Sequence, residues 1–238
     1  MNTVWIMAKK ELRSYFDSLI AYVMIIIFLG FSGFFTWLYG GDIFFVGQAS
    51  LRTFFGIAYW TLFFFIPALT MKSIAEENHS GTLELLLTKP VNEWQLVGGK
   101  YLANLIIIFV ALFLTFPYVI TVSSIGNLDQ GAVLLGYFGL LLMSSAYIGI
   151  GIFASSISQN QIVAFLIALF IGLFFHIIFG VIASTFTGAL GHIFSYLDIS
   201  THYESISRGV LDTKDLIYFL SITFLGLFFS VTKLAKRN

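Results

Sequence analysis

A run without Asp, Glu, Lys or Arg extends from Gln130 to Leu197, and it constrains the fold of this chain more than any other feature. Charged residues make up only 10% of the 238 residues, whereas a soluble domain carries about 25%. A soluble protein of this size cannot bury such a run, so lipid must be its solvent. The sequence therefore predicts an integral membrane protein. No basic stripe appears along the chain, and we expect no nucleic-acid partner.

Six continuous apolar segments are long enough to cross a hydrocarbon core about 30 Å thick. They lack the alternation that a transmembrane barrel needs, so we expect helices. The predicted fold is an all-α integral membrane protein, a six-transmembrane-helix bundle formed by one domain over residues 1–238. Pro67 and Pro117 fall inside the second and third spans, where we expect kinks that act as hinges. The expected spans are 19–39, 54–71, 101–124, 132–153, 162–183 and 216–232.

The distribution of Lys and Arg predicts the orientation of these spans, because cytoplasmic flanks carry the excess of positive charge. One side of the predicted bundle has only Arg52, Arg208 and Lys214. Both termini and the 72–100 loop should therefore be cytoplasmic. The nine positive residues on that side are Lys9, Lys10, Arg13, Lys72, Lys89, Lys100, Lys233, Lys236 and Arg237.

Two segments outside the spans are expected to form short helices. Residues 1–18 place Lys10 and Arg13 opposite an apolar face, which predicts an amphipathic helix on the inner leaflet. The alternative is a charged flank that only sets orientation. Residues 184–215 mix apolar and charged side chains over a length that is uncommon for an unstructured loop, so short helices at the outer leaflet are expected there. The apolar face of the first segment consists of Trp5, Ala8, Leu12, Phe16 and Leu19.

The loop at 72–100 contains a short amphipathic helix. Leu83, Leu86 and Leu87 recur at helical spacing, Gly81 gives a flexible entry, Thr82 is a plausible N-cap, Glu84 suits the first turn, and Pro90 stops the helix. Two turns are not stable alone in water, so the helix needs a groove in lipid or in a partner. Asn92 and Gln95 resemble the cap of the next helix.

Other chemistry finds little support in the sequence. There is no Gly-x-x-x-x-Gly-Lys-Ser/Thr loop to hold ATP phosphates, so any process in this protein that uses ATP must draw its energy from another polypeptide. The histidines are too dispersed for a metal site, and His176, inside the fifth span, is interpreted as structural. The pairs Ser145 with Gly149 and Gly151 with Ser155 let helices approach closely, either within one subunit, which we favour, or between two subunits.

The pattern Glu76-Glu77-x-x-x-Gly81-Thr82-x-Glu84-x-Leu86-x-x-x-Pro90 resembles the first cytoplasmic loop of ABC type-2 transporter permeases. In that family this loop forms the coupling helix that inserts into the ATP-binding subunit. The similarity covers the whole chain, including its six spans, N-terminal helix and outer segment. Two further stretches are similar to a branch that includes the gliding-motility-associated permease and the copper-processing permeases of nitrous-oxide reductase maturation. They are Gly149-Ile-Gly151-Ile-Phe-Ala-Ser155-Ser156-Ile-Ser158-Gln-Asn160-Gln161 and Ser207-Arg208-Gly209-Val210-Leu-Asp212.

The resemblance implies the permease half of an ATP-driven exporter in a bacterial inner membrane, with the gliding-motility type favoured. It implies four kinds of partner: a cytoplasmic ATPase that binds ATP and Mg²⁺, a second permease copy or paralogue, membrane lipid and, as an optional partner, a periplasmic auxiliary protein. This chain itself would bind no cofactor and catalyse nothing. A secondary transporter, an intramembrane enzyme and a structural anchor of a motility machine are the alternatives. The implied ATPase-coupling residues are Glu76, Glu77, Gly81, Thr82, Leu83, Glu84, Leu86, Leu87 and Pro90.

Overall fold

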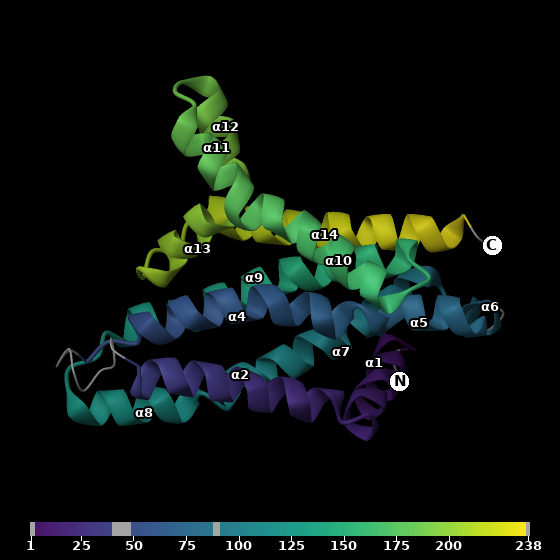
Figure 1. Cartoon of the computed structure of the whole chain (residues 1–238), viewed down its shortest axis with the longest axis horizontal. Coiled ribbons are helices and arrows are strands. Elements are labelled where there is room, and N and C mark those ends of the chain that lie inside the picture. Colours follow the sequence, from purple (N-terminus) through teal and green to yellow (C-terminus); the bar gives the residue numbers. More distant parts are fainter. Residues whose placement is uncertain (1–2, 40–48, 88–90, 237–238) are drawn as a thin grey trace.

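The computed structural model describes residues 3–39, 49–87 and 91–236, and within those ranges every regular element is a helix (Figure 1). Six helical segments are long and apolar enough to cross a membrane, which confirms the predicted all-helical bundle. Several of them are longer than the sequence suggested. The six are Ile20–Trp37, Arg52–Ser80, Glu93–Ile125, Gln130–Ile157, Gln161–Thr185 and Thr213–Ala235.

Helix α9 (Gln130–Ile157) forms the centre of the bundle, and 72% of its most apolar window is buried, against 28% for α2 (Ile20–Trp37). Its small residues let neighbouring helices approach. A Cβ added at Gly226 of α14 (Thr213–Ala235) would lie 2.5 Å from the carbonyl carbon of Gly149, and Gly151 faces Thr70 of α4 (Arg52–Thr70) in the same way. Ser145 contacts the Thr223 hydroxyl at 2.9 Å. These small residues pack within one subunit, as favoured.

The second and third spans are each divided into two helices at a position near a proline. Helix α4 contains Pro67 and ends at Thr70, and after a turn at Met71 the chain continues as α5 (Lys72–Ser80). Helix α7 (Glu93–Phe113) is followed by α8 (Phe116–Ile125), which begins with Pro117 in its first turn. The capping box predicted for Asn92 and Gln95 is present at the start of α7. Helix α4 continues through Pro67, and the interruption between α7 and α8 comes just before Pro117, so the role of the two prolines as hinges stays a prediction.

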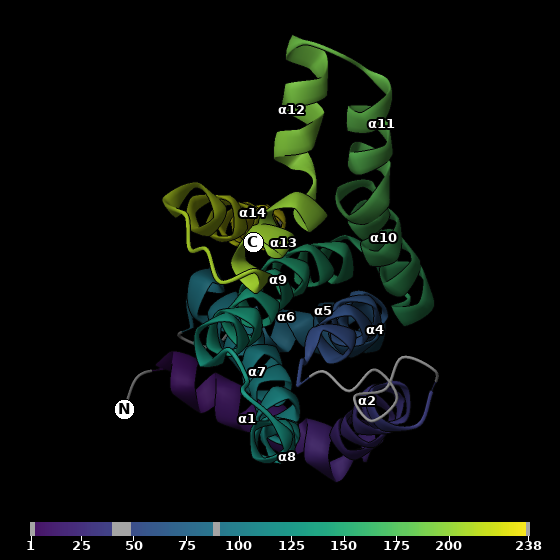
Figure 2. The same ribbon diagram turned by 90° about the vertical axis from the view of Figure 1, so that its left-hand side faces the viewer.

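The N-terminal segment forms α1 (Thr3–Asp17), which lies across the ends of the spans; Figure 2 shows it lengthwise while α4 and α9 are seen end-on. Its buried face differs in part from the predicted apolar face. Met7, Ala8 and Tyr15 are buried, and Met7 packs on Gly99 of α7, whereas Trp5 is exposed. The tight contact with α7 explains the difference, because a helix packs where its neighbour allows close approach.

The fifth span consists of α10 (Gln161–Leu173), the π-helical turn η1 (Phe174–Ile178) and α11 (Phe179–Thr185). Together with α12 (Ala189–Leu197), α11 projects away from the bundle (Figures 1 and 2). The short α12 and α13 (Ile199–Ser207) are the helices expected in the 184–215 segment. Figure 1 places α1, α5 and the C-terminal end of α14 at one end of the bundle, and α13 at the other.

Candidate functional site

The predicted coupling residues lie at the end of the bundle that holds α1, on α5 and α6 (Thr82–Leu87). The short helix expected from the leucine spacing is present. It follows α5 through Gly81, whose φ of 69° is the left-handed conformation that glycine adopts without strain. Thr82 is the first helical residue instead of the residue before it, and its hydroxyl lies 2.8 Å from that of Ser80. Pro90 lies outside the described residues.

The structure divides the predicted docking side chains into an exposed and a buried set. Glu76 and Glu84 are exposed. Leu83 is only 3% exposed and belongs to the core of this chain, so it does not stand free for a partner. Leu86 and Leu87 belong to α6, but their side chains lie outside the described part. The exposed acids thus form the part of this element that a partner can reach.

Glu77 turns inward, where the sequence suggested a partner-facing acid. Its Oε1 lies 2.9 Å from Nζ of Lys100, which also contacts Oε1 of Glu11 at 3.0 Å. Lys100 is 1% exposed, so this triad joins α1, α5 and α7 away from water. The acids were expected in a turn, but α5 continues the second span as a helix and thereby carries Glu77 back against α7. A lysine two turns inside an apolar helix was the signal that could have revealed it.

Tyr15 holds α1 to the junction between α4 and α5. Its hydroxyl lies 3.1 Å from the Leu69 carbonyl oxygen, 3.3 Å from Oγ of Ser73 and 3.0 Å from Oδ1 of Asn104. Lys72 lies over the Tyr15 ring, 4.7 Å from its centroid. Burial raises the pKa of Tyr15, so the hydroxyl stays neutral and remains able to donate a hydrogen bond.

The far side of α5 is fastened to α9. Oγ of Ser155 donates to the Met71 carbonyl oxygen and accepts from the backbone N–H groups of Ile74 and Ala75, each at 2.9 Å. These are N–H groups of the first turn of α5, which have no partner within the helix. The Asn78 side chain donates to the Ser158 carbonyl oxygen at 3.0 Å. Helix α5 is therefore held on α1, α7 and α9 at once.

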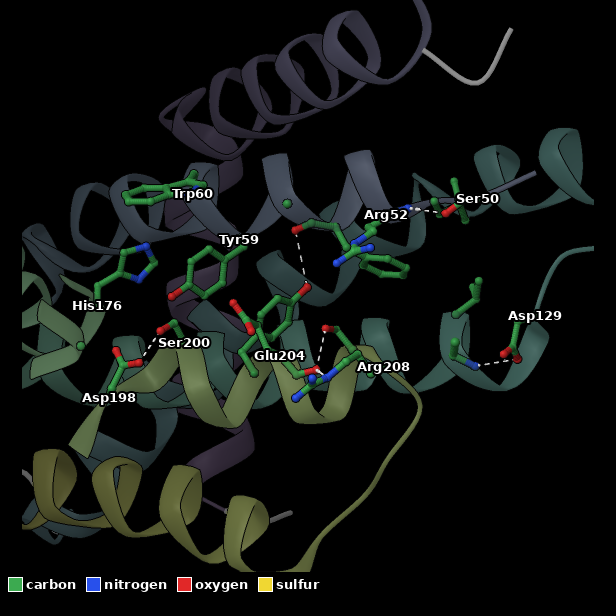
Figure 3. A pocket seen from close by; sticks show the side chains of 18 of the residues that line it. Ser50, Arg52, Tyr59, Trp60, Asp129, His176, Asp198, Ser200, Glu204 and Arg208 are labelled. Carbon is green, nitrogen blue, oxygen red and sulfur yellow. Dashed lines mark hydrogen bonds between the residues drawn. The ribbon is translucent and has the colours of Figure 1, made fainter. Parts of the chain in front are cut away.

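A second candidate site lies at the opposite end of the bundle (Figure 3). It is a cavity of about 890 Å³ between α4, α9, α13 and the stretch from η1 to α11. Its lining includes both charged and aromatic side chains. The polar and aromatic residues that line it are Ser50, Arg52, Phe55, Tyr59, Trp60, Asp129, His176, Ser184, Asp198, Ser200, Tyr203, Glu204, Ser207 and Arg208.

His176 lies in η1 at the inner end of this cavity. Its Nδ1 is 2.7 Å from the Tyr147 hydroxyl, and its ring stacks on Tyr59 and Phe63 with centroids 4.2 and 4.3 Å apart. These contacts agree with the structural role expected from the sequence. The other ring nitrogen, Nε2, is buried and has no hydrogen-bond partner among the described residues. A π-helical turn often marks a functional position, because it re-aims a side chain.

The structure also brings together a histidine and a carboxylate that sequence reasoning left apart. Nδ1 of His202 lies 2.6 Å from Oδ1 of Asp215, and its Nε2 lies 3.0 Å from the Tyr196 carbonyl oxygen. The imidazole stacks on Tyr218 with centroids 3.9 Å apart. This pair ties α13 to the start of α14. No spacing rule links two residues across a connecting loop, so only the fold reveals the pair.

Sequence similarity to known proteins identifies the class to which this chain belongs. The family model described as "ABC-2 family transporter protein" matches residues 5–234. The chain therefore belongs to the ABC-2 family of transporters, and it is a permease-type membrane subunit of an ABC transporter.

Two curated proteins illustrate the similarity. "Probable multidrug ABC transporter permease YbhR" of Escherichia coli K12 is 31% identical over 102 residues, which cover 42% of this chain and 27% of YbhR. "Probable ABC transporter permease protein NosY" of Pseudomonas aeruginosa PAO1 is 28% identical over 154 residues, which cover 63% of this chain and 56% of NosY. The alignments thus span about a quarter to just over half the length of these relatives.

Proposed function

We propose that this chain is the permease subunit of an ATP-driven exporter and that α5 and α6 receive the movement of a cytoplasmic ATPase. The ATPase binds ATP and Mg²⁺, and a second permease copy or paralogue completes the pore. The protein lies in a bacterial inner membrane with both termini in the cytoplasm. The positively charged flanks support this orientation, as do the chain ends, which lie at the same end of the bundle as α6 (Figure 1).

The observation that carries the proposal is the bracing of α5. A short exposed helix can transmit force only if the element behind it does not bend. Here Lys100, Tyr15 and Ser155 fix α5 to α1, α4, α7 and α9 by ion pairs and hydrogen bonds. Movement of α6 then shifts the cytoplasmic ends of several spans together. Pro67, inside α4, and Pro117, in the first turn of α8, lie farther along spans two and three and would absorb the resulting bend.

The host process that we propose is gliding motility. Its support is the sequence similarity around Gly149–Gln161 and Ser207–Asp212 to the gliding-motility-associated permease, together with family membership. A structural anchor in a motility machine is the alternative. The two differ in one measurement, because deletion of the ATPase gene abolishes motility if transport is required and leaves it intact if the chain only anchors other components.

The docking of α6 is tested with Glu84→Lys and Leu86→Asp. Glu84→Lys reverses an exposed charge in the first turn of α6, which disfavours the helix and repels a basic partner surface. Leu86→Asp places a charge in the partner groove, where an unpaired buried charge costs several kcal/mol. We expect each variant to lose at least nine-tenths of the ATPase that co-purifies with wild type at equal membrane abundance.

The matched control is Asp17→Lys, which makes the same kind of charge reversal at an exposed site at the same end of the bundle but outside α5 and α6. It should retain the ATPase. Wild-type recovery of the ATPase with both α6 variants would show that α6 is not the docking element. If α6 only rests on anionic lipid, Glu84→Lys should be harmless or strengthen membrane attachment.

A further inference from the structure

Three buried polar atoms meet at the inner end of the outer cavity without a hydrogen-bond partner among the described residues. They are Oη of Tyr59, Nε2 of His176 and Oδ1 of Asp198. The three side chains are 8%, 4% and 3% exposed. They come from α4, η1 and the residue before α13, and Figure 3 shows them gathered around the same end of the cavity. A buried polar atom without a partner carries a free-energy cost that a suitable ligand removes.

Asp198 gives this end of the cavity its charge. Its Oδ2 caps α13 by accepting from the backbone N–H of Thr201 at 3.2 Å, from the Thr201 hydroxyl at 2.9 Å and from Ser200. Oδ1 takes no part in the cap. None of the ion pairs within the described ranges includes Asp198. Because buried charges are normally paired, we expect a cation to bind beside this carboxylate.

The Tyr59 ring is packed so that its edge, not its faces, is available. The Tyr59 ring stacks between His176 and Tyr203, with centroids 4.2 and 4.9 Å away. Both faces of that ring are therefore covered, while Oη remains at its edge. A cation–π contact with Tyr59 is excluded by this packing, and recognition depends on hydrogen bonds and on the charge of Asp198.

An ammonium group has the matching chemistry. It carries a positive charge and up to three N–H donors, with no acceptor, so it can donate to Oδ1 of Asp198 and Oη of Tyr59 while neutralising the carboxylate. A phosphate or sulfate would bring negative charge against Asp198. No group of three His, Cys, Asp or Glu that could hold a metal ion occurs among the residues that the structure describes. A metal cation is thus a poorer fit than an amine.

The rest of the cavity indicates what kind of molecule bears the ammonium group. Its outer part has both signs of charge, from Arg52 and Arg208 as well as Asp129 and Glu204, so charge selection falls to the inner end. One wall reaches the apolar outer surface between α4 and α11, where Gly56, Trp60 and Val181 are exposed and also line the cavity. The volume lies in the usual range for ligand sites, about 300–1,000 Å³.

We propose that this cavity binds a primary ammonium group and that Asp198 and Tyr59 are its principal contacts. The opening toward lipid favours an amine carried on a lipid head group over a soluble amine. That the bound molecule is the exported substrate rests on the proposed transport function, whereas binding itself does not.

The experiment is native mass spectrometry of the purified full-length chain in detergent, titrated with phosphatidylethanolamine, phosphatidylglycerol or phosphatidylcholine of identical acyl chains. We expect phosphatidylethanolamine to bind at least tenfold more tightly than phosphatidylglycerol, which has no amine. Phosphatidylcholine should bind several-fold more weakly than phosphatidylethanolamine, because its quaternary nitrogen has no N–H donor. Titration with octylamine distinguishes the source: Asp198-dependent binding of octylamine without a lipid preference indicates a soluble amine, and it supports the same chemistry.

The decisive variant is Asp198→Asn, which can still cap α13 but removes the charge. It should abolish the preference for amines. Tyr59→Phe keeps the stacked ring, removes only Oη and should weaken amine binding about tenfold, the loss expected for one hydrogen bond to a charged group. It decides the question if Asp198→Asn does not fold. Asp212→Asn, a part-exposed helix cap that does not line the cavity, is the matched control and should bind like wild type.

Equal binding of all three lipids together with no octylamine binding would overturn the proposal. So would an amine preference that survives in Asp198→Asn or, if that variant is unfolded, amine binding by Tyr59→Phe as tight as that of wild type. Because the assay uses no ATPase, its failure leaves the docking of α6 unaffected. Conversely, failure of the docking experiment leaves amine binding intact.

Discussion

Lys100 shows how a single residue connects three helices that are far apart in the sequence. Its Nζ lies 3.0 Å from Glu11 on α1 and 2.9 Å from Glu77 on α5. The ammonium is buried, while the two carboxylates are part-buried. Two glutamates this close repel each other if the cation is removed, because the low-dielectric surroundings screen them poorly.

Lys100→Met should therefore destabilise the protein by about 3–5 kcal/mol, the usual effect of breaking a buried ion pair by removing one partner. The measurement is thermal unfolding of the purified chain in detergent. Adding Glu11→Gln and Glu77→Gln to Lys100→Met should recover part of the lost stability, since the remaining charges are then removed. Lys214→Met, which breaks an exposed pair with Asp212, serves as the control and should change little. Equal shifts for the two lysine variants would contradict the structural role of Lys100.

At the scale of the elements, the sequence located all six spans but misplaced several of their ends. The apolar runs define the spans because hydropathy reports contact with lipid. Beyond Met71 the side chains become polar, and we expected a loop. The backbone continues instead as α5, because Ser155 of α9 accepts hydrogen bonds from the first turn of α5 and Asn78 of α5 donates one to the end of α9. Because the sequence did not predict this helix, it also did not predict that Glu77 turns inward: the position of a side chain depends on the backbone that carries it.

The cavity illustrates a different reason for missing a site. Tyr59, His176 and Asp198 are separated by long stretches of sequence, and none belongs to a spacing pattern. The short helix α6 could be predicted because local leucine spacing reports it. The three cavity residues meet only through the packing of α4, η1 and α13, which local sequence does not encode.

The contact between α9 and α14 gives a test at this scale. Gly226→Ala adds a methyl group that would lie 2.5 Å from the backbone of Gly149, so the two helices must separate. We expect a loss of about 1–3 kcal/mol, typical of overpacking, seen as a lower midpoint of thermal unfolding. The control is Gly30→Ala in α2, where nothing lies within 4 Å of the added Cβ. There the better helix propensity of alanine should raise stability by up to about 1 kcal/mol. A neutral Gly226→Ala would argue against the close contact.

At the scale of the whole molecule, the two candidate sites lie at opposite ends of the bundle, with α9 running between them. Its C-terminal part contacts α5 through Ser155, and its N-terminal part lines the outer cavity through Ala132 and Val133. A tilt of this central helix would thus change both ends together. This geometry suits a transporter in which energy enters on one side and a ligand is held near the other.

The orientation of the bundle can be measured directly, because the chain has no cysteine. We expect Ser80→Cys to react with a membrane-impermeant thiol reagent only after the cells are permeabilised, and Glu204→Cys to react in intact cells. Both sites are exposed, so accessibility within the protein does not limit labelling. The excess of Lys and Arg at the α6 end is the physical basis of this prediction. Labelling of the Ser80→Cys variant in intact cells would reverse the orientation and remove the cytoplasmic position of α6.

The π-helical turn η1 has a consequence for how the fifth span is aimed. Each residue of an α-helix advances the chain by about 100° around the axis, and a π turn takes in one residue more than an α turn. The wider turn at Phe174–Ile178 therefore takes in the surplus residue, so α11 continues from α10 as one rod without the rotation of about 100° that an extra residue in a regular α-helix would cause. Deleting one residue there would let an ordinary α turn replace the π turn, so the α11–α12 hairpin would keep its direction and the hydropathy of the span would stay almost unchanged.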